Sequence, residues 1–142
     1  MDLIQGNIKK LVAHNSKIPE IICVSKTFPL DKLHPLINRG HIHFGENKVQ
    51  EALIKWNDLK EKNNKIKLHM IGKLQTNKVK KAVGLFDFIH SLDSTKLAEA
   101  LKKNEIELNK RLSYFIQINI GKENQKSGIL PEDAKAFSKH CL

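Results

Sequence analysis

Arginine is scarce in this sequence, because only Arg39 and Arg111 stand among 25 lysine and arginine residues. Aromatic residues make up only 6% of the chain and are not interleaved with the basic residues. A net charge of +10 suits a nucleic-acid-binding domain, but base and phosphate recognition favours arginine, and single-strand binding needs stacked aromatic rings. A basic nucleic-acid-binding domain is therefore the weaker alternative, which a steep salt dependence of binding to duplex DNA would revive.

Long apolar runs and cysteines are also scarce. No stretch approaches the length of a membrane span, and the amino-terminal residues lack the apolar centre of a signal peptide. The two cysteines, Cys23 and Cys141, are too few for a disulfide framework. These absences predict a cytoplasmic protein, and the length predicts one domain over residues 1–142.

The sequence does contain a regular alternation of short apolar strands and amphipathic helices. After a helix predicted at residues 2–14, strands are expected to begin near residues 21, 42, 67, 88 and 113, with differences of 21, 25, 21 and 25. This repeat predicts an α/β fold of about five βα units with short loops. The period fits either an open doubly wound sheet or a (β/α) barrel of the TIM type that stops early.

Local signals set several expected element boundaries. Pro35 removes a hydrogen bond from the helix after the first strand, which predicts a late start or a kink, and Gly40 is expected to cap that helix. Gly84 is expected to end the helix after the third strand. The fifth strand is predicted at residues 112–120, with apolar residues at every second position, so that it would form a long apolar sheet edge.

Lys26 is the main candidate functional residue. It follows the apolar run Ile21–Val24, which predicts a short first strand that is buried on both faces. Ligands of parallel α/β folds bind at the carboxyl ends of the strands, where Lys26 lies. A partly desolvated lysine has a lowered pKa, and a neutral amine attacks an aldehyde, so Lys26 is a candidate for Schiff-base formation. A solvated lysine is the ordinary alternative.

Four blocks of residues at the expected strand ends occur in a specific order. They are Val24-Ser25-Lys26-Thr27 with Phe44-Gly45-Glu46-Asn47, then His69-Met70-Ile71-Gly72-Lys73-Leu74-Gln75-Thr76-Asn77-Lys78, then His90-Ser91-Leu92-Asp93-Ser94, and finally Gln117-Ile118-Asn119-Ile120 with Lys126-Ser127-Gly128. From about Ile21 onward the chain resembles the pyridoxal phosphate homeostasis proteins, the YggS/PROSC family, which in turn resembles the amino-terminal barrel of alanine racemase.

The resemblance implies a cofactor, pyridoxal 5′-phosphate, held as a Schiff base on Lys26. By the same likeness, Asn47, His69 and Asn119 would border the cofactor cavity, although a core histidine bonded to backbone is an equal interpretation of His69. His41 and His43 alternate on one strand face and could bind a metal, but no third ligand has suitable spacing, so no metal site is expected.

The resemblance also implies that part of the family's barrel is missing. The family's chains continue through three further strands, which carry the phosphate-holding loops and an arginine near the pyridine nitrogen. Because the sequence ends at Leu142, it resembles a truncated or split member, and a second polypeptide completing the barrel would be a partner.

The implied function is to bind pyridoxal 5′-phosphate and buffer its intracellular supply, without a defined reaction. A pyridoxal-phosphate-dependent amino-acid racemase is the enzymatic alternative, but it needs a second acid or base, and the only tyrosine, Tyr114, lies inside the fifth strand.

Overall fold

Five parallel strands form one sheet, in the order in which they occur in the chain. The computed structural model describes residues 2–12 and 18–141. The strands are β1 (Cys23–Val24), β2 (His43–Glu46), β3 (Lys67–Met70), β4 (Phe88–Leu92) and β5 (Ser113–Ile116). Each strand therefore pairs with the strand of the preceding βα unit, and β1 and β5 are the two edges.

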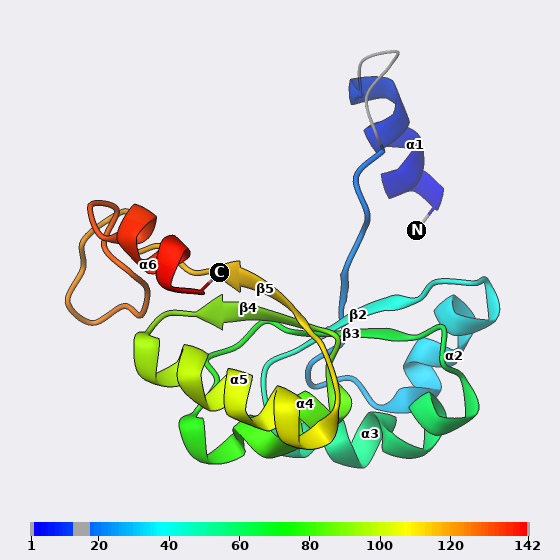
Figure 1. The fold of residues 1–142 in the computed structure, drawn as a ribbon. Helices are drawn as coiled ribbons and strands as arrows, with labels where there is room; N and C mark the ends of the chain where they lie inside the picture. The colour runs from blue at the N-terminus through cyan, green and yellow to red at the C-terminus, as the bar shows by residue number, and fades with distance from the viewer. Residues whose placement is uncertain (1, 13–17, 142) are drawn as a thin grey trace.

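The helices between the strands all cover the same face of the sheet (Figure 1). They are α2 (Leu30–Asn38), α3 (Val49–Lys62), α4 (Val79–Leu85), which a short 3₁₀ turn η1 (Thr76–Lys78) precedes, and α5 (Thr95–Leu108). A doubly wound sheet reverses its strand order and carries helices on both faces, so that alternative is wrong. Sequential order with helices on one face is the arrangement of a (β/α) barrel, here with five βα units.

The hydrophobic core lies between the sheet and these helices. On the sheet side, Phe44, Leu68, Met70 and Ile89 are at most 1% exposed. The helices contribute the buried residues Ala52, Trp56, Val79, Ala82, Val83, Leu97 and Leu101. Side chains alternate across a strand, so the residues between these core positions point to the opposite face. That opposite face carries His43, His69, Phe88, His90 and Phe115, whose rings contact one another across the strands.

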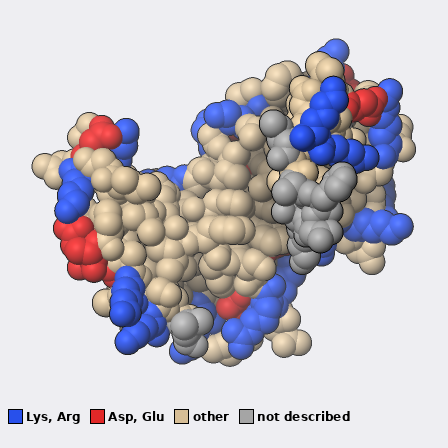
Figure 2. All heavy atoms as spheres, turned by 90° about the horizontal axis from the view of Figure 1, so that it is seen from above, with Lys and Arg blue, Asp and Glu red and all other residues tan. Residues whose placement is uncertain are grey.

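The opposite face is concave and is not covered by the α2–α5 layer. Figure 2 looks onto it: most of the middle is free of charged side chains, and both basic and acidic side chains lie around it. Helix α1 (Asp2–Leu11) stands away from the sheet, and α6 (Ala134–Cys141) lies beyond β5 (Figure 1). None of the described helices is long and apolar enough to cross a bilayer.

Two predictions about β1 and α1 need correction. The first strand is only two residues long, shorter than the four-residue apolar run that predicted it, and Val24 is 48% exposed, because β1 is an edge strand with helices on only one side. Burial on both faces is therefore wrong. Helix α1 ends at Leu11 instead of residue 14; residues 13–17 lie outside the described residues.

Of the other predicted boundaries, the cap at Gly40 is confirmed, and the ends of two elements differ from the prediction. Helix α2 begins at Leu30 and retains Pro35, so its start is not late, and Gly40 follows it with φ +82° as a cap requires. Helix α4 continues through Gly84 to Leu85. Strand β5 ends at Ile116 rather than residue 120 because β4 ends at Leu92. Beyond that point, Ile118 pairs with Ile129 instead.

Candidate functional site

The carboxyl ends of β1 and β2 bring Lys26 and Asn47 next to each other. Val24 pairs with Gly45, and the Ser25 amide donates to the Gly45 carbonyl at 2.9 Å, so that the register continues toward Lys26 and Asn47. The chain then turns sharply at Thr27, where φ is +66°, and the Phe28 amide donates back to the Ser25 carbonyl. Lys26 is thus the last residue before the chain leaves the sheet edge.

The Lys26 side chain is exposed, and its amine makes no hydrogen bond or ion pair with any residue that the structure describes. The strand-end position of Lys26 predicted a partly desolvated amine. That expectation is wrong, because Lys26 is exposed and none of the residues that the structure describes adds a strand to the sheet edge at β1. An accessible, unengaged amine at a strand end remains a suitable nucleophile for a carbonyl compound in its neutral form.

Beneath Lys26 lies a buried polar cluster that was not predicted from the sequence. Glu46 is completely buried, and its Oε1 accepts hydrogen bonds from Ser25 Oγ at 2.8 Å, Lys55 Nζ at 2.8 Å and Trp56 Nε1 at 2.9 Å. The cluster therefore ties the ends of β1 and β2 to helix α3. A signal for it existed, because Glu46 shares the two-residue period of Phe44 and so had to face the core.

Asn47 is half-buried and lies against the loop that follows β3. A Cβ atom added to Gly72 would lie 2.4 Å from the Asn47 carbonyl oxygen and 2.8 Å from its Cα. Glycine is therefore the residue that this close approach of the two strand ends requires. The contact holds Asn47 at the edge next to Lys26.

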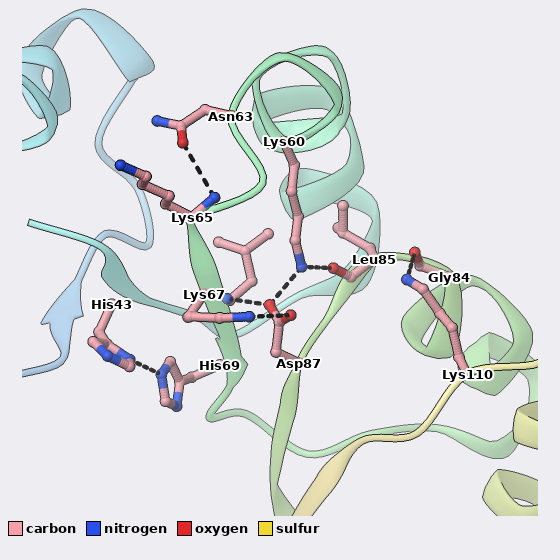
Figure 3. Close-up of polar contacts among 11 residues, drawn as sticks. His43, Lys60, Asn63, Lys65, Lys67, His69, Gly84, Leu85, Asp87 and Lys110 are labelled. Atoms are coloured by element: carbon pink, nitrogen blue, oxygen red, sulfur yellow. Dashed lines mark hydrogen bonds and ion pairs between the residues drawn. The ribbon is translucent and has the colours of Figure 1, made fainter.

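His69 belongs to a row of three histidines across the exposed face of the sheet. His69 Nε2 lies 2.9 Å from His43 Nδ1, and His69 Nδ1 lies 2.9 Å from His90 Nε2; Figure 3 shows the contact with His43. Burial lowers the pKa of His69 to about 4, and the neighbouring His90 and His43 add to this shift. Both ring nitrogens of His69 are thus engaged by histidines, rather than by backbone.

No metal site emerges from these histidines. His41 Nε2 contacts the backbone carbonyl of His43, and the ring of His41 packs against Phe44, so that the two histidines do not converge. Within residues 2–12 and 18–141, no group of three His, Cys, Asp or Glu side chains is arranged to hold a metal ion.

Asn119 is engaged by its own loop. Its side-chain amide donates to the Glu123 carbonyl at 2.9 Å, and its Oδ1 accepts from the Glu123 amide at 3.3 Å. A cavity of about 410 Å³ lies here, between this loop and the end of β3, with Ile71, Lys73, Asn119 and Lys126 among its lining residues. Lys26, Asn47 and His69 do not line it, so the structure does not bring the four predicted residues into one pocket.

The opposite, amino-terminal ends of the strands are held by a separate ion-pair cluster (Figure 3). Asp87 Oδ2 accepts hydrogen bonds from Lys60 Nζ at 2.5 Å and from the Leu68 amide at 2.8 Å. Burial lowers the pKa of Lys60, and the pairing with Asp87 opposes this shift. Because functional sites of such folds lie at the other end of the strands, this cluster serves stability.

A sequential parallel sheet, helices on one face and an accessible lysine at the end of its first strand define a protein of the (β/α)-barrel class. The chain belongs to the alanine racemase N-terminal domain family, whose family model matches residues 1–142.

Curated relatives agree with the resemblance found in the sequence. A pyridoxal phosphate homeostasis protein from Pasteurella multocida is 38% identical over 140 residues, which are 96% of this chain and 60% of the relative. One of the same name from Aquifex aeolicus is 37% identical over 123 residues, 87% of this chain and 53% of the relative. The chain thus spans between about half and three fifths of these relatives.

Solved structures confirm the fold class. PipY of Synechococcus elongatus, solved without PLP, superposes with a TM-score of 0.81 at 34% identity, over 96% of this chain and 61% of PipY. PipY with PLP bound gives a TM-score of 0.76. Alanine racemase of Clostridium difficile, at 14% identity and a TM-score of 0.68, shares the fold alone.

Proposed function

We propose that this chain binds pyridoxal 5′-phosphate through Lys26 and takes part in buffering the intracellular supply of that cofactor. The observation that carries the proposal is the exposed, unengaged amine of Lys26 at the carboxyl end of β1. The homeostasis function of the curated relatives and the bound cofactor in PipY support it. The cytoplasmic location and the single-domain assignment of residues 1–142 stay predictions.

The bound cofactor would supply an electrophilic aldehyde. The neutral Nζ of Lys26 would add to the aldehyde carbon, and loss of one water molecule would leave a carbon–nitrogen double bond, the Schiff base. Asn47, adjacent in register, would offer its side-chain amide to the ring substituents, while the histidine row would form the floor beneath them. Asn119 would act by shaping the loop that bears its cavity.

The phosphate group of the cofactor needs binding loops, and the five βα units that the structure describes do not include the loops that usually supply them. Barrels of this class often hold phosphate at the loops after strands seven and eight. The curated relatives are longer than this chain, so we propose that such loops, in the same or a second polypeptide, complete the site. The 142-residue chain alone would then bind the cofactor more weakly than a complete barrel.

Trapping with borohydride tests the assignment of Lys26. Adding pyridoxal 5′-phosphate to the purified chain, reducing with borohydride and mapping peptides should place most of the label on Lys26. Lys26→Ala should lose that label, whereas Lys32→Ala, which removes an exposed lysine of α2, should keep it. Label spread evenly over the lysines would contradict the assignment.

We also expect the chain not to catalyse reactions of amino acids. Tyr114 cannot face a ligand on Lys26, because it points to the helix-covered side of β5, where burial raises its pKa far above the usual value and Glu105 adds to the shift. The rate at which alanine exchanges its α-hydrogen, measured by isotope incorporation, should therefore be no higher than the rate with free cofactor. Turnover that disappears in Lys26→Ala would favour the racemase alternative.

A further inference from the structure

Lys55 is a second amine at the strand end that bears Lys26. Its side chain is only 12% exposed, and Nζ donates to the Ser25 carbonyl at 2.8 Å and to Glu46 Oε1 at 2.8 Å. The Ser25 carbonyl belongs to the peptide bond that joins Ser25 to Lys26. Lys55 therefore lies just beneath the backbone of Lys26, on the helix side of the sheet.

Burial of a charged pair is unfavourable unless its geometry and remaining hydrogen bonds compensate, so the position of this pair calls for an explanation. The ammonium group of an ion pair has no lone pair with which to add to an aldehyde, and Lys55 forms such an ion pair with Glu46 in the protein interior. Glu46 thus engages one of the two neighbouring amines and leaves the other, Lys26, accessible.

The same carboxylate also fixes the backbone from which Lys26 extends. Ser25 is completely buried: its amide donates to Gly45, its hydroxyl to Glu46, and its carbonyl accepts from Lys55 and Phe28. Since β1 is only two residues long, these contacts, rather than a long strand ladder, hold Lys26 in place.

We propose that Glu46 is a positioning and selectivity residue: it anchors Ser25 beneath Lys26 and blocks Lys55, so that Lys26 alone reacts with a carbonyl ligand. The selectivity for pyridoxal 5′-phosphate rests on the proposed function, whereas the blocking of Lys55 is testable without that cofactor.

Glu46→Gln isolates the role of the negative charge. Ser25, Lys55 and Trp56 all contact Oε1, while the buried Oε2 has no partner among the described residues. Glutamine can keep its oxygen at the Oε1 position and place its amide nitrogen at the unpartnered position. The bonds from Ser25 and Trp56 then remain, and only the ion pair with Lys55 is lost. Glu51→Gln is the matched control, because Glu51, in the first turn of α3, pairs with the exposed Lys48 just before that helix.

The first measurement uses formaldehyde and borohydride to methylate the native chain, with mass spectrometry of each lysine. In the wild type, Lys55 should react at least about tenfold more slowly than Lys26, because its protons are donated to a carboxylate and a carbonyl. Glu46→Gln should remove most of this difference, and Glu51→Gln should not. Equal reactivity of Lys26 and Lys55 in the wild type would overturn the proposal.

The second measurement uses limiting pyridoxal 5′-phosphate and borohydride. In Glu46→Gln, label should divide between Lys26 and Lys55, and adding Lys55→Met should return it to Lys26. Label confined to Lys26 in folded Glu46→Gln would overturn the proposed selectivity. A third outcome is that Lys55 of the wild type resists methylation while Lys26 of the wild type takes up no pyridoxal 5′-phosphate label. That outcome would contradict the proposed function and support the blocking role of Glu46.

Ser25→Ala tests the anchoring role even if Glu46→Gln does not fold, as judged by circular dichroism. Loss of the hydroxyl should slow labelling of Lys26 about threefold by loosening its position, while Lys55 stays protected. An unchanged labelling rate at Lys26 would contradict the anchoring role.

Discussion

Gly72 and Gly84 show how differently two glycines of neighbouring segments depend on their surroundings. The space of a Gly72 side chain is occupied by the backbone of Asn47, whereas nothing lies within 4 Å of the corresponding position at Gly84, in helix α4. The first glycine is needed by the candidate site, and the second only weakens a helix.

Alanine substitutions at these positions should therefore act in opposite directions. Gly72→Ala should lower the free energy of unfolding by about 2 kcal/mol or more, because the strand ends must separate. Gly84→Ala should raise it by about 0.5–1 kcal/mol through helix propensity. Urea unfolding gives the free energy of unfolding of both variants. Equal changes in the two variants would show that the strand ends do not meet as described.

Individual residues differ in how far the sequence predicts their roles. Lys26 was predictable because an apolar run stops just before it. Its exposure was not, since that depends on what covers the sheet edge. The histidine row could not be predicted, because His43, His69 and His90 are 26 and 21 residues apart and meet only through the strand registers.

At the scale of elements, the row of histidines on β2, β3 and β4 makes the stability of the sheet depend on pH. The folded-state pKa of His69, about 4, lies below its ordinary value of 6.5, so the unfolded chain binds more protons between these values. The pKa values of His41 and His90 are also lowered, chiefly by burial. Stability present above pH 6.5 is therefore lost as the pH falls toward 4.

The expected result is a free energy of unfolding that falls by about 1.4 kcal/mol per pH unit between pH 6.5 and 4 from His69. The lowered pKa values of His41 and His90 should change stability in the same direction. His69→Leu should make this slope shallower by about one proton. Phe88→Leu, which removes the ring stacked on His69 at 4.2 Å but no titratable group, should lower stability without changing the slope. Urea unfolding at several pH values distinguishes the two, and an unchanged slope in His69→Leu would contradict the assignment.

Element positions were predicted better than element lengths. Hydrophobic periodicity marks where each βα unit begins, because it reports which residues face the core. A strand ends where its neighbour ends, and this is not encoded locally: β5 stops at Ile116 because β4 offers no partner beyond Leu92. The choice between a barrel and a doubly wound sheet likewise depended on which face the helices cover.

The whole molecule exposes a concave sheet face between two edge strands. Val24, Phe115, Ile118 and Ile120 are 48%, 51%, 42% and 82% exposed on or near it. Open edges and exposed apolar side chains favour pairing with other chains. We expect the 142-residue polypeptide, produced alone, to self-associate and to have marginal stability.

Sedimentation velocity at several concentrations measures this association. Ile120→Lys should weaken it, because a charge replaces the most exposed of these side chains. Supplying the segment that corresponds to the remaining length of the relatives, fused or as a second polypeptide, should restore a monodisperse protein and tighter cofactor binding together. A monomeric, cooperatively folded and tightly binding 142-residue chain would contradict both expectations.

The sequential strand order also has a consequence for the growing chain during synthesis. Each strand pairs with the strand that was made just before it, so every new βα unit finds its docking partner already present. Ser25, Lys26, Glu46, Asn47 and Lys55 all lie in β1, β2, α3 and their connecting loops, which are complete once Lys62 has emerged. The support of the candidate lysine can therefore assemble while the rest of the sheet is still being translated.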